Sequence, residues 1–146
     1  CVMPGYNSRL DTIQAIVGLE VLKELLWVTE RRQANAKRYD EGLRGLKEVT
    51  IPYRDSDVEQ VYHLYQVEVE RRDELLAYLQ AKGIEAKVHY AIPLHLQPGF
   101  KSLGYQEGDF PRAEAFARDH LTLPVHQYLS NEQLDYVVEA IRGFYH

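Results

Sequence analysis

Asn7 and Arg9, close to the N-terminus, carry two side chains that bind anions, an amide and a guanidinium. They fall in residues 1–9, which the breakers Pro4 and Gly5 predict to be extended or turning. Two residues at this spacing in an extended chain point to the same side, with Cα atoms ~6–7 Å apart. Such a pair could share one cluster of anionic oxygens, such as a phosphate. The alternative is that Asn7 shapes a turn and Arg9 forms a surface ion pair.

His89, Tyr90 and His95 form a second group of candidate residues. The sequence from 84 to 90 alternates as a strand does, so His89 and Tyr90 end a predicted strand and His95 lies in the loop after it. Scaffolds often present functional side chains at such places. Imidazole and phenol groups suit a ligand with phosphates and hydroxyls. The alternative is partly buried histidines bonded to the backbone, with Tyr90 at the edge of the core.

The composition argues against several other kinds of chemistry. A net charge of −5 and a pI near 5.7 are unlike those of a protein that binds nucleic acid through its phosphates. The six histidines show no H-E-x-x-H spacing and the single cysteine is terminal, so we expect no metal site. No G-x-S-x-G motif supports a serine nucleophile. We expect a cytoplasmic protein, since there is no secretory signal and no apolar run of membrane length.

The candidate residues must be positioned by a mixture of helices and strands. Helices are predicted over about 11–46, 72–82, 111–120 and 130–144, and strands over 61–69, 84–90 and 121–124. Gly83 is a good helix stop, and Ser130 with Gln133 has the spacing of a capping box. The order of elements predicts an α+β domain, in which helices cover a small sheet.

The front of the first predicted helix is apolar on nearly every side between residues 13 and 28. A helix of this kind is normally buried. The remaining hundred or so residues can hardly surround it, so we expect covering structure from another domain or another subunit. The chain also begins with Cys1 and not with methionine, which indicates a piece of a longer protein.

Several blocks of sequence, taken together, resemble the DegT/DnrJ/EryC1/StrS family of sugar aminotransferases. Their order and spacing extend over nearly all of the chain, which makes the resemblance specific. The blocks are Gly5-Tyr6-Asn7-Ser8-Arg9-Leu10-Asp11, Arg32 with Ala36, Tyr39 and Leu43, His63-Leu64-Tyr65, Arg72-Asp73-Glu74-Leu75, Gly83-Ile84, His89-Tyr90 with Pro93-Leu94-His95 and Gln97-Pro98, Gly108-Asp109-Phe110-Pro111, and Leu121-Thr122-Leu123-Pro124.

The resemblance implies an aspartate-aminotransferase-like architecture, known as fold type I. Residues 1–46 would be an inter-domain segment and a long linking helix. Residues 47–146 would be the small C-terminal α+β domain, with an antiparallel or mixed sheet. The large domain of the family supplies the lysine that holds the cofactor, and no lysine of this chain lies in a matching motif. We therefore expect no catalytic residue here, and no activity from this chain alone.

The resemblance also implies a pyridoxal 5′-phosphate-dependent transfer of an amino group, from glutamate, to a keto-sugar nucleotide. Asn7 would reach the phosphate of the neighbouring subunit's cofactor in a homodimer, and Arg9 would lie near the cofactor or the substrate phosphates. His89, Tyr90 and His95 would contact the substrate. Two alternatives stay open: a pyridoxal-dependent sugar dehydratase of the same family, and a non-catalytic α+β binding module.

Overall fold

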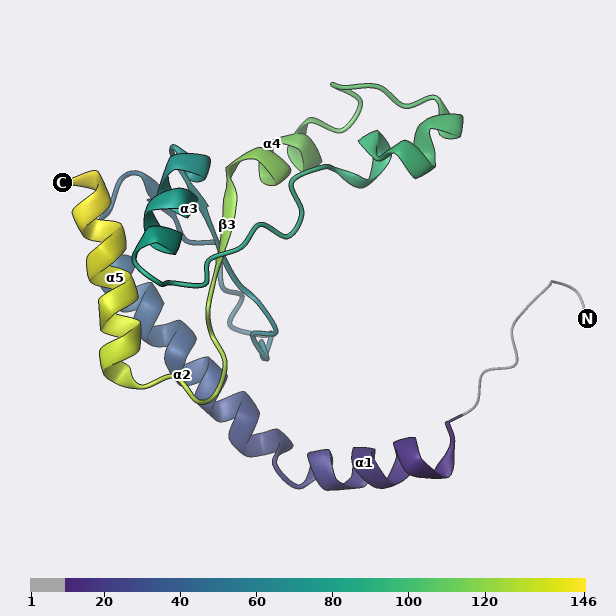
Figure 1. Ribbon diagram of the computed structural model, residues 1–146, viewed down its shortest axis with the longest axis vertical. Coiled ribbons are helices and arrows are strands. Elements are labelled where there is room, and N and C mark those ends of the chain that lie inside the picture. The colour runs from purple at the N-terminus through teal and green to yellow at the C-terminus, as the bar shows by residue number, and fades with distance from the viewer. Residues whose placement is uncertain (1–9) are drawn as a thin grey trace, which may run out of the picture.

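The computed structural model describes residues 10–146, so Asn7 and Arg9 lie outside the described residues (Figure 1). The order of elements is helix-rich at both ends, with a small sheet between. The elements are α1 (Thr12–Leu22), α2 (Leu25–Leu43), β1 (Val49–Thr50), β2 (Tyr65–Val69), α3 (Arg72–Ala81), the 3₁₀ turns η1 (Leu94–Leu96) and η2 (Pro98–Leu103), α4 (Pro111–Asp119), β3 (His120–Leu123) and α5 (Asn131–Tyr145).

The helix predicted over 11–46 is divided into α1 and α2. A capping box begins α1, where the Gln14 N–H donates to Asp11 Oδ1 at 3.0 Å and the Asp11 N–H donates to Gln14 Oε1 at 3.2 Å. The helix ends where the N–H groups of Lys23 and Glu24 turn back to carbonyls only three residues earlier, both at 3.2 Å. This tighter turn changes the direction of the chain, and α2 leaves at an angle to α1 (Figure 1).

The sheet has three antiparallel strands in the order β1-β2-β3. Tyr65 pairs with Leu123 and Val67 with Leu121. The prediction of a strand over 84–90 is wrong, because only Lys87 forms a bridge, with Thr122. The Ala86 N–H instead donates to the Ile84 carbonyl at 2.9 Å, a tight turn that is incompatible with an extended strand.

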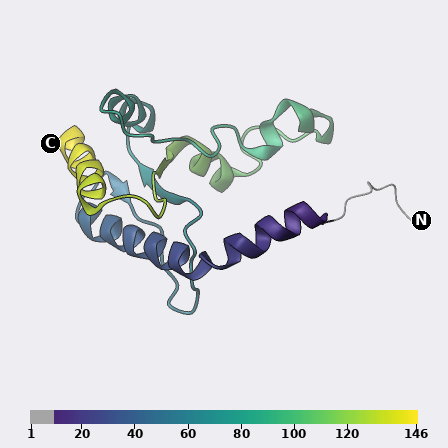
Figure 2. The same ribbon diagram turned by 60° about the horizontal axis from the view of Figure 1, so that its bottom comes forward.

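One face of the sheet carries the core. Alternate residues of β2 are buried, and α2, α3 and α5 pack over that face, with α5 in contact with both other helices. The side chains of α2 also reach the segment after β3, where the Tyr39 hydroxyl donates to the Pro124 carbonyl at 2.8 Å. Figure 2 shows α5 lying beside α2 at one end of the molecule. The predicted capping box at Ser130 and Gln133 and the stop at Gly83, which has a φ of +76°, are both confirmed.

On the opposite face of β3, the side chains of His120 and Thr122 are buried although they are polar. They alternate with Leu121 and Leu123, which face the core. The Lys87–Thr122 bridge places the chain around Lys87 along the free edge of β3. The His89 ring and helix α4 then contact the polar side chains of the second face, through Thr122 and His120 respectively. This face therefore positions the candidate residue His89.

Helix α1 projects away from the rest of the molecule (Figure 1). Within the described part of the chain none of its residues is buried, and Ile13 and Leu19 are 76% and 66% exposed. The expectation that the remaining residues cannot cover this helix is confirmed. Among the described residues no helix is both long and apolar enough to cross a membrane.

Candidate functional site

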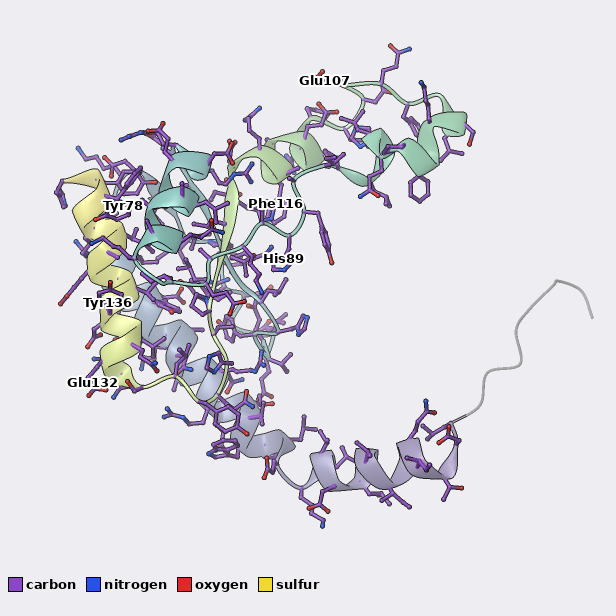
Figure 3. The ribbon with its side chains drawn as sticks, in the orientation of Figure 1. Tyr78, His89, Glu107, Phe116, Glu132 and Tyr136 are labelled. Atoms are coloured by element: carbon purple, nitrogen blue, oxygen red, sulfur yellow. The ribbon has the colours of Figure 1, made fainter. Side chains whose placement is uncertain are left out.

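His89 is held against the second face of the sheet by its ring and its backbone. Its Nδ1 atom lies 3.0 Å from Thr122 Oγ1, and its carbonyl accepts a hydrogen bond from Gln66 Nε2 at 3.2 Å. Because Thr122 and Gln66 belong to neighbouring strands, both partners are fixed by the sheet register. Figure 3 shows the labelled His89 on the side of the sheet that faces away from α5.

His120 fixes the backbone of His89 from beneath. Its ring is completely buried, stacks on Phe116 at a centroid distance of 4.2 Å, and bonds through Nδ1 to the Phe116 carbonyl. Its Nε2 atom lies 3.2 Å from the backbone nitrogen of His89 and 2.7 Å from the carbonyl oxygen of the same residue, so the ring contacts both polar backbone groups of His89. Sequence reasoning missed His120 and Thr122. Their polar side chains alternate with leucines, which was the available signal.

Tyr90 is brought next to His89 and stays open to solvent. Its side chain is 73% exposed, and its ring lies edge-on to that of His89 at 5.7 Å. The peptide bond between the two residues is cis. The structure therefore presents an imidazole and a phenol together at one surface, as the sequence predicts for a ligand rich in oxygen.

His95 lies elsewhere, on η1 in the extended arm formed by residues 91–110 (Figure 1). Its side chain is only 8% exposed, and Nε2 lies 3.0 Å from Glu114 Oε1. Its ring packs on Phe110 and lines an apolar hollow of about 340 Å³. This hollow is separate from the cleft that His89 lines. The structure gives His95 a role in holding the arm, and its contact with a substrate stays a prediction.

Glu114 joins the arm to α4. Its carboxylate accepts the Gly108 N–H at 2.9 Å and 3.0 Å, the Phe110 N–H at 3.3 Å, and the contact from His95. Burial by itself opposes ionisation, but the Gly108 N–H, the His95 side chain and the Phe110 N–H together hold the pKa of Glu114 below its usual range.

We expect the arm to open at acid pH. A lowered pKa in the folded protein means that the stabilisation is complete above the unfolded pKa of about 4.3. It is lost as the pH falls through the lower, folded value. The NMR signals of the Gly108 and Phe110 amides should therefore move toward unfolded positions with a midpoint below pH ~4.3. In Glu114→Gln the same signals should report an opened arm already at neutral pH. Wild-type amide signals in that variant would contradict this role.

A cleft of about 330 Å³ lies beside His89, with basic side chains from four parts of the chain around it. We call it the basic cleft. Sequence reasoning assigned no role to most of these residues, which are distant from one another along the chain. Its charged and histidine side chains are Arg32, His63, Glu85, Lys87, His89 and His126.

The described residues do not offer a complete site for pyridoxal phosphate. A lysine that forms a Schiff base is typically desolvated or flanked by another cation. Every lysine from residue 10 onward is exposed. In the same part of the chain, histidine, cysteine and carboxylate groups form no cluster of three that could hold a metal ion. The two residues that the sequence predicts at the cofactor phosphate, Asn7 and Arg9, lie outside this part.

Comparison with solved structures defines the class of protein. The described fold superposes on the crystal structure of Streptomyces venezuelae DesV in complex with a ketimine intermediate, with a TM-score of 0.92 and 41% identity over 98% of this chain. The chain has the fold of the small α+β part of a fold type I sugar aminotransferase. A profile of the DegT/DnrJ/EryC1/StrS aminotransferase family matches residues 2–142. The chain belongs to that family.

Two further matches agree with this assignment to the family. The dTDP-3-amino-3,4,6-trideoxy-alpha-D-glucose transaminase of Streptomyces venezuelae is 43% identical over 94% of this chain. The PLP-form of Spr1654 from Streptococcus pneumoniae is 32% identical, with a TM-score of 0.86 over 97% of this chain. The chain spans only 36% of the first relative and 37% of the second.

Proposed function

We propose that this chain is the small-domain part of a pyridoxal phosphate-dependent aminotransferase. The complete enzyme transfers an amino group, from glutamate, onto the keto carbon of a nucleotide-linked sugar. The observation that carries the proposal is the match of almost the whole chain, in sequence and in fold, to a sugar aminotransferase solved with a reaction intermediate.

In this proposal the chain contributes binding groups and no covalent chemistry. Pyridoxal phosphate, when bound, supplies the electron sink that amino transfer needs. His89 and Tyr90 donate hydrogen bonds to the substrate, and their joint presentation at one surface supports that role. Asn7 and Arg9 bind phosphate groups at a site shared between the two subunits of a homodimer. The same proposal includes a boundary after residue 46, between the linking helix and the small domain, and a cytoplasmic location for the enzyme.

Two observations favour this function over the alternatives. The relative with 43% identity is named a transaminase, which favours amination over dehydration. A free-standing binding module has no reason to expose an apolar helix such as α1, because large exposed apolar patches are rare on monomers.

The amination assay tests the proposal. The complete protein that contains this chain, supplied with pyridoxal phosphate, glutamate and a panel of keto-sugar nucleotides, should form 2-oxoglutarate and an amino sugar nucleotide, both measured by mass spectrometry. The 146-residue chain alone should form neither. Loss of water from the sugar without gain of nitrogen would instead establish the dehydratase, and no reaction with any sugar nucleotide would contradict the proposal.

A further inference from the structure

The basic cleft differs in charge from the other hollows on the described surface. Its lining has two cationic side chains, three histidines and one carboxylate. The hollow beneath the loop at residues 54–60 has the opposite balance, with two basic and four acidic side chains. The hollow beside β1 has the same acidic excess. In a chain with a net charge of −5, the local reversal marks the basic cleft as a place for an anion.

The donors of the basic cleft stand on fixed backbone. Lys87 is held by two hydrogen bonds to Thr122, at 3.0 Å and 2.8 Å, and the His89 ring is held by the same threonine. Arg32 donates from Nη1 to the carbonyls of Tyr62 and His63, at 2.9 Å and 3.2 Å. Its Nε is buried and has no hydrogen-bond partner among the described residues. Preorganised donors of this kind bind an anion with little loss of conformational entropy.

One carboxylate already occupies this positive environment. Glu85 Oε1 lies 2.6 Å from Lys87 Nζ. Lys87, and more weakly His126, hold the pKa of Glu85 below its usual range. Glu85 therefore stays ionised near neutral pH and competes with any external anion for the Lys87 ammonium.

We propose that the basic cleft binds the diphosphate of the nucleotide-linked sugar. The inference rests on the proposed function and names the part of the substrate that this chain recognises. Lys87 gives the positive charge, and His89 and His126 give imidazole N–H donors from either side. When the diphosphate binds, it replaces the Glu85 carboxylate as the partner of the Lys87 ammonium. The volume of about 330 Å³ lies at the low end of the usual range for ligand pockets, about 300–1,000 Å³, as suits a diphosphate and not a whole nucleotide.

Two substitutions with opposite expected effects on ligand affinity test the basic cleft. In the complete protein, Lys87→Gln should weaken the binding of uridine diphosphate and of inorganic pyrophosphate roughly five- to tenfold, because a charge-assisted hydrogen bond is lost. Glu85→Gln should strengthen both roughly two- to fivefold, because it removes the competitor of the ligand. The control Lys101→Gln lies on η2, outside the lining of the basic cleft, removes the same charge and should stay within about twofold of wild type. Calorimetry measures the affinities, and circular dichroism checks that each variant is folded.

The outcomes separate this inference from the proposed function. Unchanged affinity for both probes in folded Lys87→Gln, or weaker binding in Glu85→Gln, would overturn the cleft even if the enzyme aminates its substrate. Lys87-dependent binding of pyrophosphate without any amination would support the cleft and overturn the proposed function. Equal effects of Lys87→Gln and Lys101→Gln would show a general charge effect and also overturn the cleft.

Discussion

The 146-residue chain on its own should self-associate at tens of micromolar, and two substitutions in α1 should make it monomeric. Helix α1 exposes apolar side chains on all sides, with Ile16 and Leu19 at 62% and 66% exposure. Continuous apolar surfaces above a few hundred Å² rarely stay in water. Pairing of this helix between two copies is the simplest way to bury it.

Ile16→Lys combined with Leu19→Lys places two charges on one side of α1, since the two positions are three residues apart. The free energy of unfolding should change by no more than roughly 0.5 kcal/mol, because neither side chain is buried. The control Gln80→Lys with Glu139→Gln adds the same net charge on exposed positions of α3 and α5 and should leave the association unchanged. Analytical ultracentrifugation measures the association state of the α1 variant and of the control. A monomeric wild-type chain at this concentration would contradict the interpretation of α1.

The parts of the fold that could be predicted from the sequence are those fixed by local chemistry. The capping box at Ser130 and the positive-φ position at Gly83 depend on a few adjacent residues, and both are found where they were expected. The period of apolar residues placed α3 and α4 within a residue or two of their observed ends.

The predictions that failed depend on contacts distant in sequence. The segment 84–90 alternates as a strand does, but Ile84 and Ala86 are joined by a tight turn, and within this segment only Lys87 pairs with β3 through a backbone bridge. The strand predicted from residue 61 begins at Tyr65, because Tyr62 adopts a positive φ of 47°. Nothing in the local pattern shows that the chain turns at these places.

The candidate site was predictable in part for the same reason. His89 and Tyr90 could be identified as neighbours in sequence at the end of an alternating segment. The partners that fix His89 come from β2 and β3 and become its neighbours only after folding. Likewise, His95 resembles a ligand-binding histidine in sequence, whereas its Glu114 partner and its small exposed fraction are properties of the folded arm.

The position of the cofactor lysine tests the central claim most directly. In the proposed function, this chain supplies binding groups only. The covalent chemistry of the enzyme depends on residues outside this chain. Borohydride reduction of the complete protein with stoichiometric pyridoxal phosphate, followed by peptide mapping, attaches the cofactor permanently to its lysine. We predict a single labelled lysine outside these 146 residues, and no label when the 146-residue chain is treated alone. A stoichiometric label on a lysine of this chain, Lys87 included, would contradict the account.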